Sequence, residues 1–599
     1  MSDTGRARPG GWRLLLVLLV LALAGCATIP TSGPVRAGDD LPQGRVEEGV
    51  SAIGQDPAKD ASPEDIVLGF LQSGADFVND HEVARKYLTP TARQRWRPQA
   101  ETVVYESSLA VRSTGGGAKV SVDGAGVGRI DAEGSFQRSG ADGTVTKDFG
   151  LSKIDGQWRI DTLADGLLLP LTDVGDTYRQ FSLYFLAPSG GTLVPDPVLL
   201  PELPGLPGLS TKLVVRLLRG PTAGTREGVT TAFPPGTGLE VGSVPVSSDG
   251  LATVRLDASA LEANDDAREQ MSAQIVWTLK QLPEVQKVRI TAGGENLVVS
   301  GVAQDIPRDA WATYDPDDLP ASTSAYVVRR RVIGRYLTTA DATRFDPVAG
   351  EAGTGNLDLR TPAVSLDARR VAAVGDGGRT VYVSPLARDG RLEPRVRGAD
   401  GSDLSQPSWD PGNNLWVVDR ATGQLWYLAD GANEPQEVSV PPLANDRKPT
   451  AVAVARDGAR VALVVGAGRN ARLRLLAVRR DPTDPSVATG ERLSLVNPRD
   501  PLPDLRDVRD VSWADSTFLA VLGSRDGGPV QPQYLSIDGY EVRDVEPLAD
   551  QTTLSAASPP GQPQPYPLMA GTSNGELWQF TSSGGWVLVG EGSDPTYPG

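Results

Sequence analysis

The sequence predicts a multi-domain protein with an α+β N-terminal domain, an α/β central domain and an all-β C-terminal propeller of about six blades. Three observations support this prediction. Helical apolar periodicity after residue 62 gives way to period-two alternation. Strand, helix and hairpin patterns then follow one another in the middle of the chain. Finally, a strand-turn-strand unit recurs over about the last 270 residues.

The first segment, residues 1–25, has the layout of a secretory signal peptide. Three arginines precede an apolar run, 14–24, which as a helix would cover roughly 16 Å of the ~30 Å hydrocarbon core of a bilayer. Small residues then lead to Cys26, the only cysteine in the sequence. An ordinary cleaved signal or a weak signal anchor is the alternative to the interpretation that follows.

Leu23, Ala24, Gly25 and Cys26 together resemble the lipobox of bacterial lipoproteins. The resemblance implies cleavage before Cys26, a diacylglyceryl group on its sulfur and an acyl chain, such as palmitate, on its new amino terminus. One chain binds a membrane only marginally, whereas two or more anchor a protein stably. We therefore predict lipid attachment at Cys26, which would tether the chain to the outer face of the cell membrane.

The composition excludes several classes of protein and site. The formal net charge is −17, and the chain has no dense Lys/Arg cluster, which argues against a nucleic-acid partner. A single cysteine leaves no internal disulfide, and together with a single histidine it excludes zinc sites of the usual Cys/His type. We expect no metal and no cofactor.

His81 is the only histidine, so any Ser/His/Asp or Cys/His arrangement would have to include it. A lone histidine at a helix start is typical of a surface or capping residue, and no Gly-x-Ser-x-Gly elbow accompanies it. The glycine-rich run 124–128 does not precede a helix, and we interpret it as a turn between strands. A carboxylate pair that hydrolyses glycans stays open, because the relevant spacing is three-dimensional. We predict no catalytic residue.

Residues 26–61 are predicted to form a flexible tether, because Pro, Gly and charged residues are abundant there and aromatic residues are absent. An α+β domain is predicted over 62–181. Ser62 suits an N-cap, Pro63 suits the first helical position, and a second helical pattern covers 81–96. From residue 103 the apolar period changes to two, which predicts an antiparallel sheet with the helices on one face.

The next segment, 182–305, contains several short motifs in a fixed order. They are Leu183-Tyr184-Phe185, Leu217-Leu218-Arg219-Gly220-Pro221, Phe233-Pro234-Pro235-Gly236-Thr237 before a predicted hairpin, and Gln274-Ile275-Val276-Trp277-Thr278-Leu279. Their order resembles the GerMN (sporulation and germination) domain, so we expect a GerMN-like fold. Caps, turns and core positions account for all of these residues, and we expect a structural role for each. Residues 306–324 are predicted to be a linker.

The propeller is predicted over 325–599, from repeats that each read as strand, polar turn and strand. Asp367, Asp410, Asp457 and Asp515 occupy equivalent places and lie 43, 47 and 58 residues apart. A four-stranded propeller blade takes about 40–50 residues, so the last interval contains an insertion. An aspartate in a repeated tight turn is a turn former, and we favour this role over a metal or catalytic one.

These parts occur in the order found in the LpqB family of actinobacterial lipoproteins, which the chain resembles over essentially its whole length. The resemblance implies a non-enzymatic accessory lipoprotein. It would bind the extracellular sensor domain of the MtrB histidine kinase and modulate MtrAB two-component signalling, with consequences for cell-wall homeostasis and division. Two alternatives stay open. One is an enzyme acting on cell-wall glycan or peptide, and the other is a sensor of a cell-wall ligand that binds in the propeller funnel.

Overall fold

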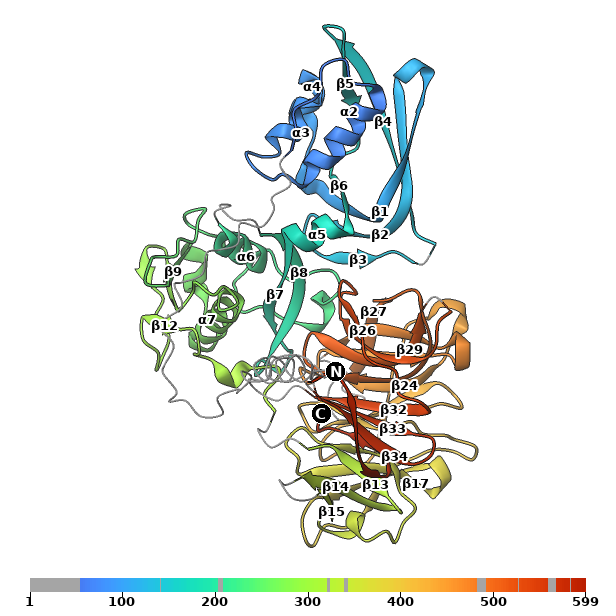
Figure 1. The fold of residues 1–599 in the computed structure, drawn as a ribbon. Helices are drawn as coiled ribbons and strands as arrows, with labels where there is room; N and C mark the ends of the chain where they lie inside the picture. The colour runs from blue at the N-terminus through green and yellow to red at the C-terminus, as the bar shows by residue number, and fades with distance from the viewer. Residues whose placement is uncertain are drawn as a thin grey trace, which may run out of the picture. The chain divides into compact units, whose positions relative to one another are not determined.

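The computed structural model describes residues 54–140, 142–202, 208–319, 324–338, 343–481, 492–525, 527–557, 567–581 and 583–599. Their helices and strands are labelled in Figure 1. They form an N-terminal mixed domain, a central α/β domain and a C-terminal propeller, so the predicted fold class is confirmed.

Helix α2 (Pro63–Gln72) opens the N-terminal domain, and the local sequence fixes its start. Ser62 Oγ accepts a hydrogen bond from the Asp65 N–H at 3.1 Å, and the Asp65 side chain accepts one from the Ser62 N–H at 3.3 Å. This is a reciprocal capping box, which satisfies two backbone donors that the helix itself leaves free. The buried face of α2, including Ile66 and Phe70, packs on one sheet. That sheet consists of β1 (Glu101–Thr114), β2 (Lys119–Asp131), β3 (Phe136–Arg138), β4 (Thr144–Ile154), β5 (Gln157–Thr162) and β6 (Leu167–Pro170).

The second helical pattern forms two short helices, α3 (Glu82–Lys86) and α4 (Pro90–Arg95), with a break between them. Pro90 has no N–H with which to continue a preceding helix, so it starts a new one. Thr89 caps this helix through its Oγ1, which accepts from the Ala92 N–H at 3.3 Å.

The glycine-rich run 124–128 was expected to be a turn, and this interpretation is wrong. Strand β2 passes through it, and bulges shift its register with β1 on either side of Tyr105. A Cβ at Gly128 would lie 2.6 Å from the backbone oxygen of Gln137 on the neighbouring β3. Glycine is therefore needed there for the close approach of two strands.

Helix α5 (Leu171–Thr177) ends the N-terminal domain, and its Val174 lies in that core. The central domain begins with the antiparallel hairpin of β7 (Tyr178–Leu186) and β8 (Leu193–Pro201). Its other elements are α6 (Leu209–Leu218), β9 (Leu251–Leu256), α7 (Asp265–Leu279), β10 (Lys287–Ala292), β11 (Glu295–Asn296) and β12 (Asp305–Pro307). Strands β9 and β10 pair in parallel and share one hydrophobic core with both helices. The hairpin expected before β9 is reduced to two isolated bridges, Leu239 with Leu256 and Val246 with Ala252.

The C-terminal part is a propeller whose described strands form six four-stranded sheets (Figure 1). The first blade contains β13 (Tyr326–Arg329), β14 (Val332–Thr338), β15 (Thr343–Pro347) and β36 (Ser593–Thr596). The second contains β16 (Arg360–Val364), β17 (Arg370–Gly375), β18 (Thr380–Pro385) and β19 (Glu393–Arg397), and the third β20 (Ser408–Trp409), β21 (Leu415–Asp419), β22 (Gln424–Leu428) and β23 (Gln436–Val438). The fourth contains β24 (Pro449–Val454), β25 (Arg460–Val465), β26 (Arg472–Asp481) and β27 (Arg492–Arg499), and the fifth β28 (Leu505–Trp513), β29 (Phe518–Arg525), β30 (Gln531–Ser536) and β31 (Val542–Asp544). The sixth contains β32 (Gln551–Ala556), β33 (Leu568–Thr572), β34 (Glu576–Phe580) and β35 (Trp586–Glu591).

Strand β36 closes the propeller ring. It contacts the inner strand β32 of the sixth blade and the inner strand β16 of the second, and it pairs antiparallel with β13. Beyond the strand, the Tyr597 N–H donates to Ser555 Oγ at 3.0 Å, and the Gly599 N–H donates to the Val364 oxygen at 3.0 Å. Tyr597 is only 6% exposed. The last seven residues therefore join the first, second and sixth blades.

Candidate functional site

The repeated aspartates of the propeller are turn formers, as the sequence predicts. In each case a side-chain oxygen accepts a hydrogen bond from the backbone N–H two residues later, at distances between 2.6 and 3.0 Å. The pairs are Asp367 with Arg369, Asp410 with Gly412, Asp457 with Ala459, and Asp515 with Thr517. These carboxylates accept hydrogen bonds from the backbone of their own turns, which supports a structural role over a metal-binding or catalytic one.

The Ser-Trp pair that precedes two of these aspartates holds neighbouring blades together. The Trp409 indole N–H donates to the Ala363 oxygen of the second blade at 3.1 Å, and Ser408 Oγ accepts from the Val454 N–H of the fourth blade at 2.9 Å. Trp513 repeats the first contact with the Ala453 oxygen at 3.0 Å. Sequence reasoning found this motif but not its contacts, because its partners are 46 and 60 residues away.

One buried guanidinium connects the propeller to the central domain. Arg460, 4% exposed, forms an ion pair with Asp457 and donates to the Ser516 oxygen at 2.7 Å and the Pro195 oxygen of β8 at 3.2 Å. Its guanidinium carbon also lies 5.3 Å from the centre of the Trp513 ring. A single side chain therefore links two blades and a strand of another domain.

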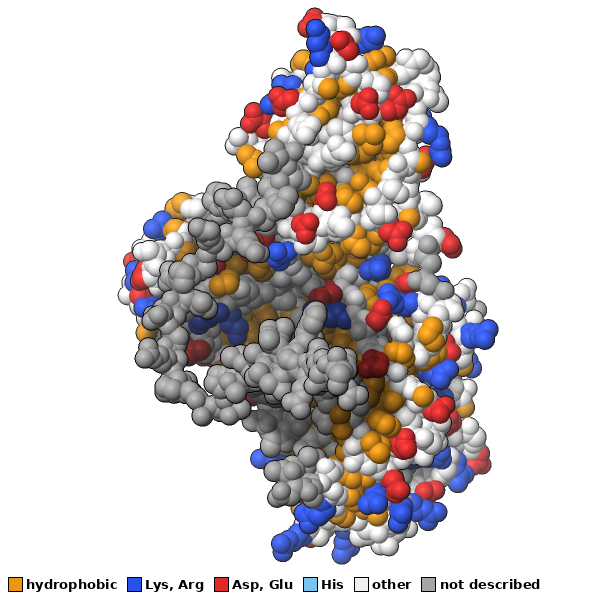
Figure 2. Space-filling view, in the orientation of Figure 1, with side chains coloured by type: hydrophobic (Ala, Val, Ile, Leu, Met, Phe, Trp, Pro, Cys, Tyr) orange, Lys and Arg blue, Asp and Glu red, His pale blue; other side chains and the backbone are white. Residues whose placement is uncertain are grey.

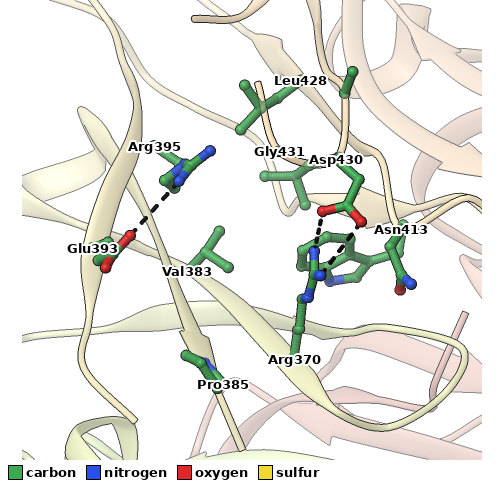
Figure 3. A pocket seen from close by; sticks show the side chains of 12 residues that line it. Arg370, Val383, Pro385, Glu393, Arg395, Asn413, Leu428, Asp430 and Gly431 are labelled. Atoms are coloured by element: carbon green, nitrogen blue, oxygen red, sulfur yellow. Dashed lines mark hydrogen bonds and ion pairs between the residues drawn. The ribbon is translucent and has the colours of Figure 1, made fainter. Parts of the chain in front are cut away.

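A cavity of about 290 Å³ opens between the second and third blades (Figure 3). Its apolar lining comes from Val383, Trp409, Leu415 and Leu428. Small-molecule pockets start at about this size. The cavity is therefore large enough for a side chain or a small group of a partner.

Two ion pairs border this cavity, and Figure 3 shows both. Arg370 Nη1 lies 2.5 Å from Asp430 Oδ1, and Arg395 Nη1 lies 3.6 Å from Glu393 Oε2. The hydrogen bond to Asp430 raises the pKa of Arg370. Because each guanidinium already has a carboxylate partner, the site presents a neutralised polar rim around an apolar floor. It suits an amphipathic side chain better than a free ion.

The predicted lipid attachment residue Cys26 and the lipobox residues Leu23, Ala24 and Gly25 lie outside the described residues.

The motif residue Gln274 is buried. Its Nε2 donates to the Tyr184 oxygen and its Oε1 accepts from the Ala232 N–H, both at 2.9 Å. Its role in the central domain is structural, as expected.

His81 differs from expectation. It was expected to be a surface or capping residue, but it is 3% exposed and makes no capping hydrogen bond. Its backbone φ of 59° lies in the left-handed region, which places the ring between Phe77 and Trp96 rather than in solvent. Nothing in the local sequence signals this conformation.

Comparison with known families accounts for most of the chain. Residues 56–175 match the family described as "Lipoprotein LpqB, N-terminal domain", 182–298 match "Sporulation and spore germination", and 336–598 match "Lipoprotein LpqB beta-propeller domain". Lipoprotein LpqB of Thermobifida fusca is 33% identical, covering 97% of each chain. The chain belongs to the LpqB lipoprotein family.

Other LpqB lipoproteins show the same relationship, and the family resemblance stated from the sequence is confirmed. The Streptomyces coelicolor protein is 33% identical over 99% of both chains, and the Mycobacterium tuberculosis protein is 30% identical over 76% of this chain and 78% of its own. Among solved structures, the first GerMN domain of GerM from Bacillus subtilis covers 22% of the chain at 20% identity, with a TM-score of 0.19.

For this LpqB family member, the described residues contain no group of three or more His, Cys, Asp or Glu side chains that could hold a metal ion. Over the same part of the chain, no helix is long and apolar enough to cross a membrane. On the face drawn in Figure 2, basic and acidic side chains are interspersed over the described surface.

Proposed function

We propose that this chain is a lipid-anchored extracytoplasmic accessory protein. It binds the sensor domain of an MtrB-type histidine kinase and modulates MtrAB two-component signalling, with effects on cell-wall homeostasis and division. The observation that carries the proposal is the similarity to LpqB lipoproteins over almost the entire chain. The lipobox-like sequence ending at Cys26 supplies the anchor.

The kinase contact includes the cavity between the second and third blades. The Arg370–Asp430 pair at its rim is partly exposed, with side-chain exposures of 37% and 44%, so a partner can reach it. The apolar floor offers burial to an inserted side chain, and interface energy concentrates in such pockets. The propeller ring is closed by its own last strand, so it presents this surface on a rigid scaffold.

Direct binding is tested with the full chain in nanodiscs and the purified kinase. The two should associate at about 50 µM or below. Reversal of charge in Arg370→Glu should weaken binding about tenfold, because it places two carboxylates together at the rim. Biolayer interferometry measures both values.

The matched control is Arg379→Glu. Arg379 lies on the same blade, is exposed and pairs with Asp400 at 3.5 Å, but it does not line the cavity. It should bind the kinase like the unmodified chain. Absence of association at about 50 µM excludes direct binding, whereas equal weakening by both variants excludes the cavity as the contact.

A substitution of Cys26 tests the proposed lipid anchor. Cys26→Ala should remove the sulfur that receives the diacylglyceryl group, so the precursor should keep its signal peptide or be processed aberrantly. Radiolabelled palmitate incorporation should then be lost, while Ser32→Ala, six residues further along, should incorporate it normally. Unchanged labelling of Cys26→Ala would show that lipid attachment occurs elsewhere.

A further inference from the structure

A second cavity, of about 360 Å³, is lined by the N-terminal domain and the central domain. Its volume falls within the range of small-molecule sites. Most of the lining is apolar, and it includes Phe77, Ile130, Leu167, Leu199 and Leu200. The proposed kinase contact does not involve this cavity.

A buried polar atom without a partner belongs to this lining. His81 lines the cavity, and within the described part of the chain its Nδ1 has no hydrogen-bond partner. The ring lies 4.8 Å from Phe77 and 5.9 Å from Trp96, centre to centre. The His81 ring is thus held by packing and not by a hydrogen bond from Nδ1. Burial also lowers the pKa of His81.

The three carboxylates of the lining are already engaged. Arg85 and Gln99 bind Asp80, Lys147 binds Glu101 at 3.1 Å, and the N–H groups of Glu133 and Ser135 bind Asp131 at 2.9 Å. Cationic side chains thus pair with Asp80 and Glu101, and backbone donors hold Asp131 in its turn.

Lys212 differs from these three carboxylates in its bonding. It lines the same cavity from helix α6, and no hydrogen bond or ion pair engages its ammonium group among the described residues. Burial lowers the pKa of Lys212. Among the described residues that line the cavity, Lys212 is the one Lys or Arg side chain, and it is not ion-paired to the lining carboxylates.

We propose that this cavity binds a small monocarboxylate with an apolar body, such as a medium-chain fatty acid. Its carboxylate pairs with Lys212, and its body lies along the apolar lining beside the His81 ring. Apolar burial supplies affinity, and the ammonium selects an anion over a neutral or cationic amphiphile.

The single histidine makes the test specific. The full chain, purified without a histidine tag and placed in nanodiscs, is labelled with ¹³C-histidine, so its spectrum contains one histidine signal, that of His81. Octanoate is the probe, and octan-1-ol and octylammonium are the comparison ligands. Octanoate should shift the signal saturably at low millimolar concentration or below, and the comparison ligands should bind at least about tenfold more weakly.

Variants of Lys212 test whether the carboxylate of octanoate pairs with this residue. Lys212→Met should raise the octanoate Kd at least about tenfold, and Lys212→Arg should stay within about threefold of the unmodified chain. Lys287→Met, an exposed lysine on β10, should leave the Kd unchanged. Thermal unfolding checks that all three variants remain folded.

Three results would overturn the proposal. One is an unmoved His81 signal at about 10 mM octanoate, and the second is equal binding of octan-1-ol. The third is a folded Lys212→Met chain that binds octanoate as tightly as the unmodified one.

Discussion

Removal of residues 593–599 is expected to unfold the propeller or to lower its free energy of unfolding by more than about 5 kcal/mol. The deletion removes β36, the hydrogen bonds to Ser555 and Val364, and the buried Tyr597 ring. Loss of a buried aromatic side chain alone costs about 3–5 kcal/mol, and the edge of β13 loses its paired strand. Urea unfolding followed by tryptophan fluorescence measures the change.

A matched comparison separates ring closure from ordinary loss of side chains. Leu588→Ala alters the sixth blade at a side chain that is 51% exposed, and it should change stability by less than about 0.5 kcal/mol. A synthetic peptide of residues 590–599 should restore the truncated chain by supplying β36 in trans. A truncated chain with unaltered urea midpoint would show that the ring does not depend on this strand.

Arg460→Met is expected to cost about 3–5 kcal/mol, because it leaves the Asp457 carboxylate buried without its counter-charge. The methionine fills much of the same volume but cannot donate to Ser516 or Pro195. The same urea measurement should show the loss in the propeller transition.

The double variant Arg460→Met/Asp457→Asn should recover part of that loss, because the unpaired charge is gone while the turn hydrogen bond from Ala459 can remain. Arg469→Met, at an exposed arginine of the same blade, is the control and should be nearly neutral. If Arg460→Met matches this control, the buried network contributes nothing to stability.

The sequence predicts what depends on local patterns and misses what depends on distant pairing. The spacing of Asp367, Asp410, Asp457 and Asp515 reveals the blades, because each turn is built from neighbouring residues. Strand β36 gives no such signal. It has four residues, includes Pro595, and pairs with β13, whose residue Val328 lies opposite Ser593.

The candidate sites are also built from residues that are distant in the sequence. Asp430 and Arg370 come from different blades, and His81 and Lys212 come from different domains, so neither cavity has a signature in the sequence. His81 was misjudged because its left-handed backbone conformation turns a helix-start residue inward. Cys26 is the opposite case, since its predicted role depends only on the four residues of the motif.

Closure by β36 also sets an order of events during folding. Every other described strand of the propeller precedes β36 in the chain, so a chain that folds from its N-terminal side onward cannot complete the ring until residues 593–596 are present. Until then the first blade lacks its inner strand and the inner edges of its neighbours stay exposed. A chain that stops short of β36 would therefore keep an open ring and would be more accessible to proteases.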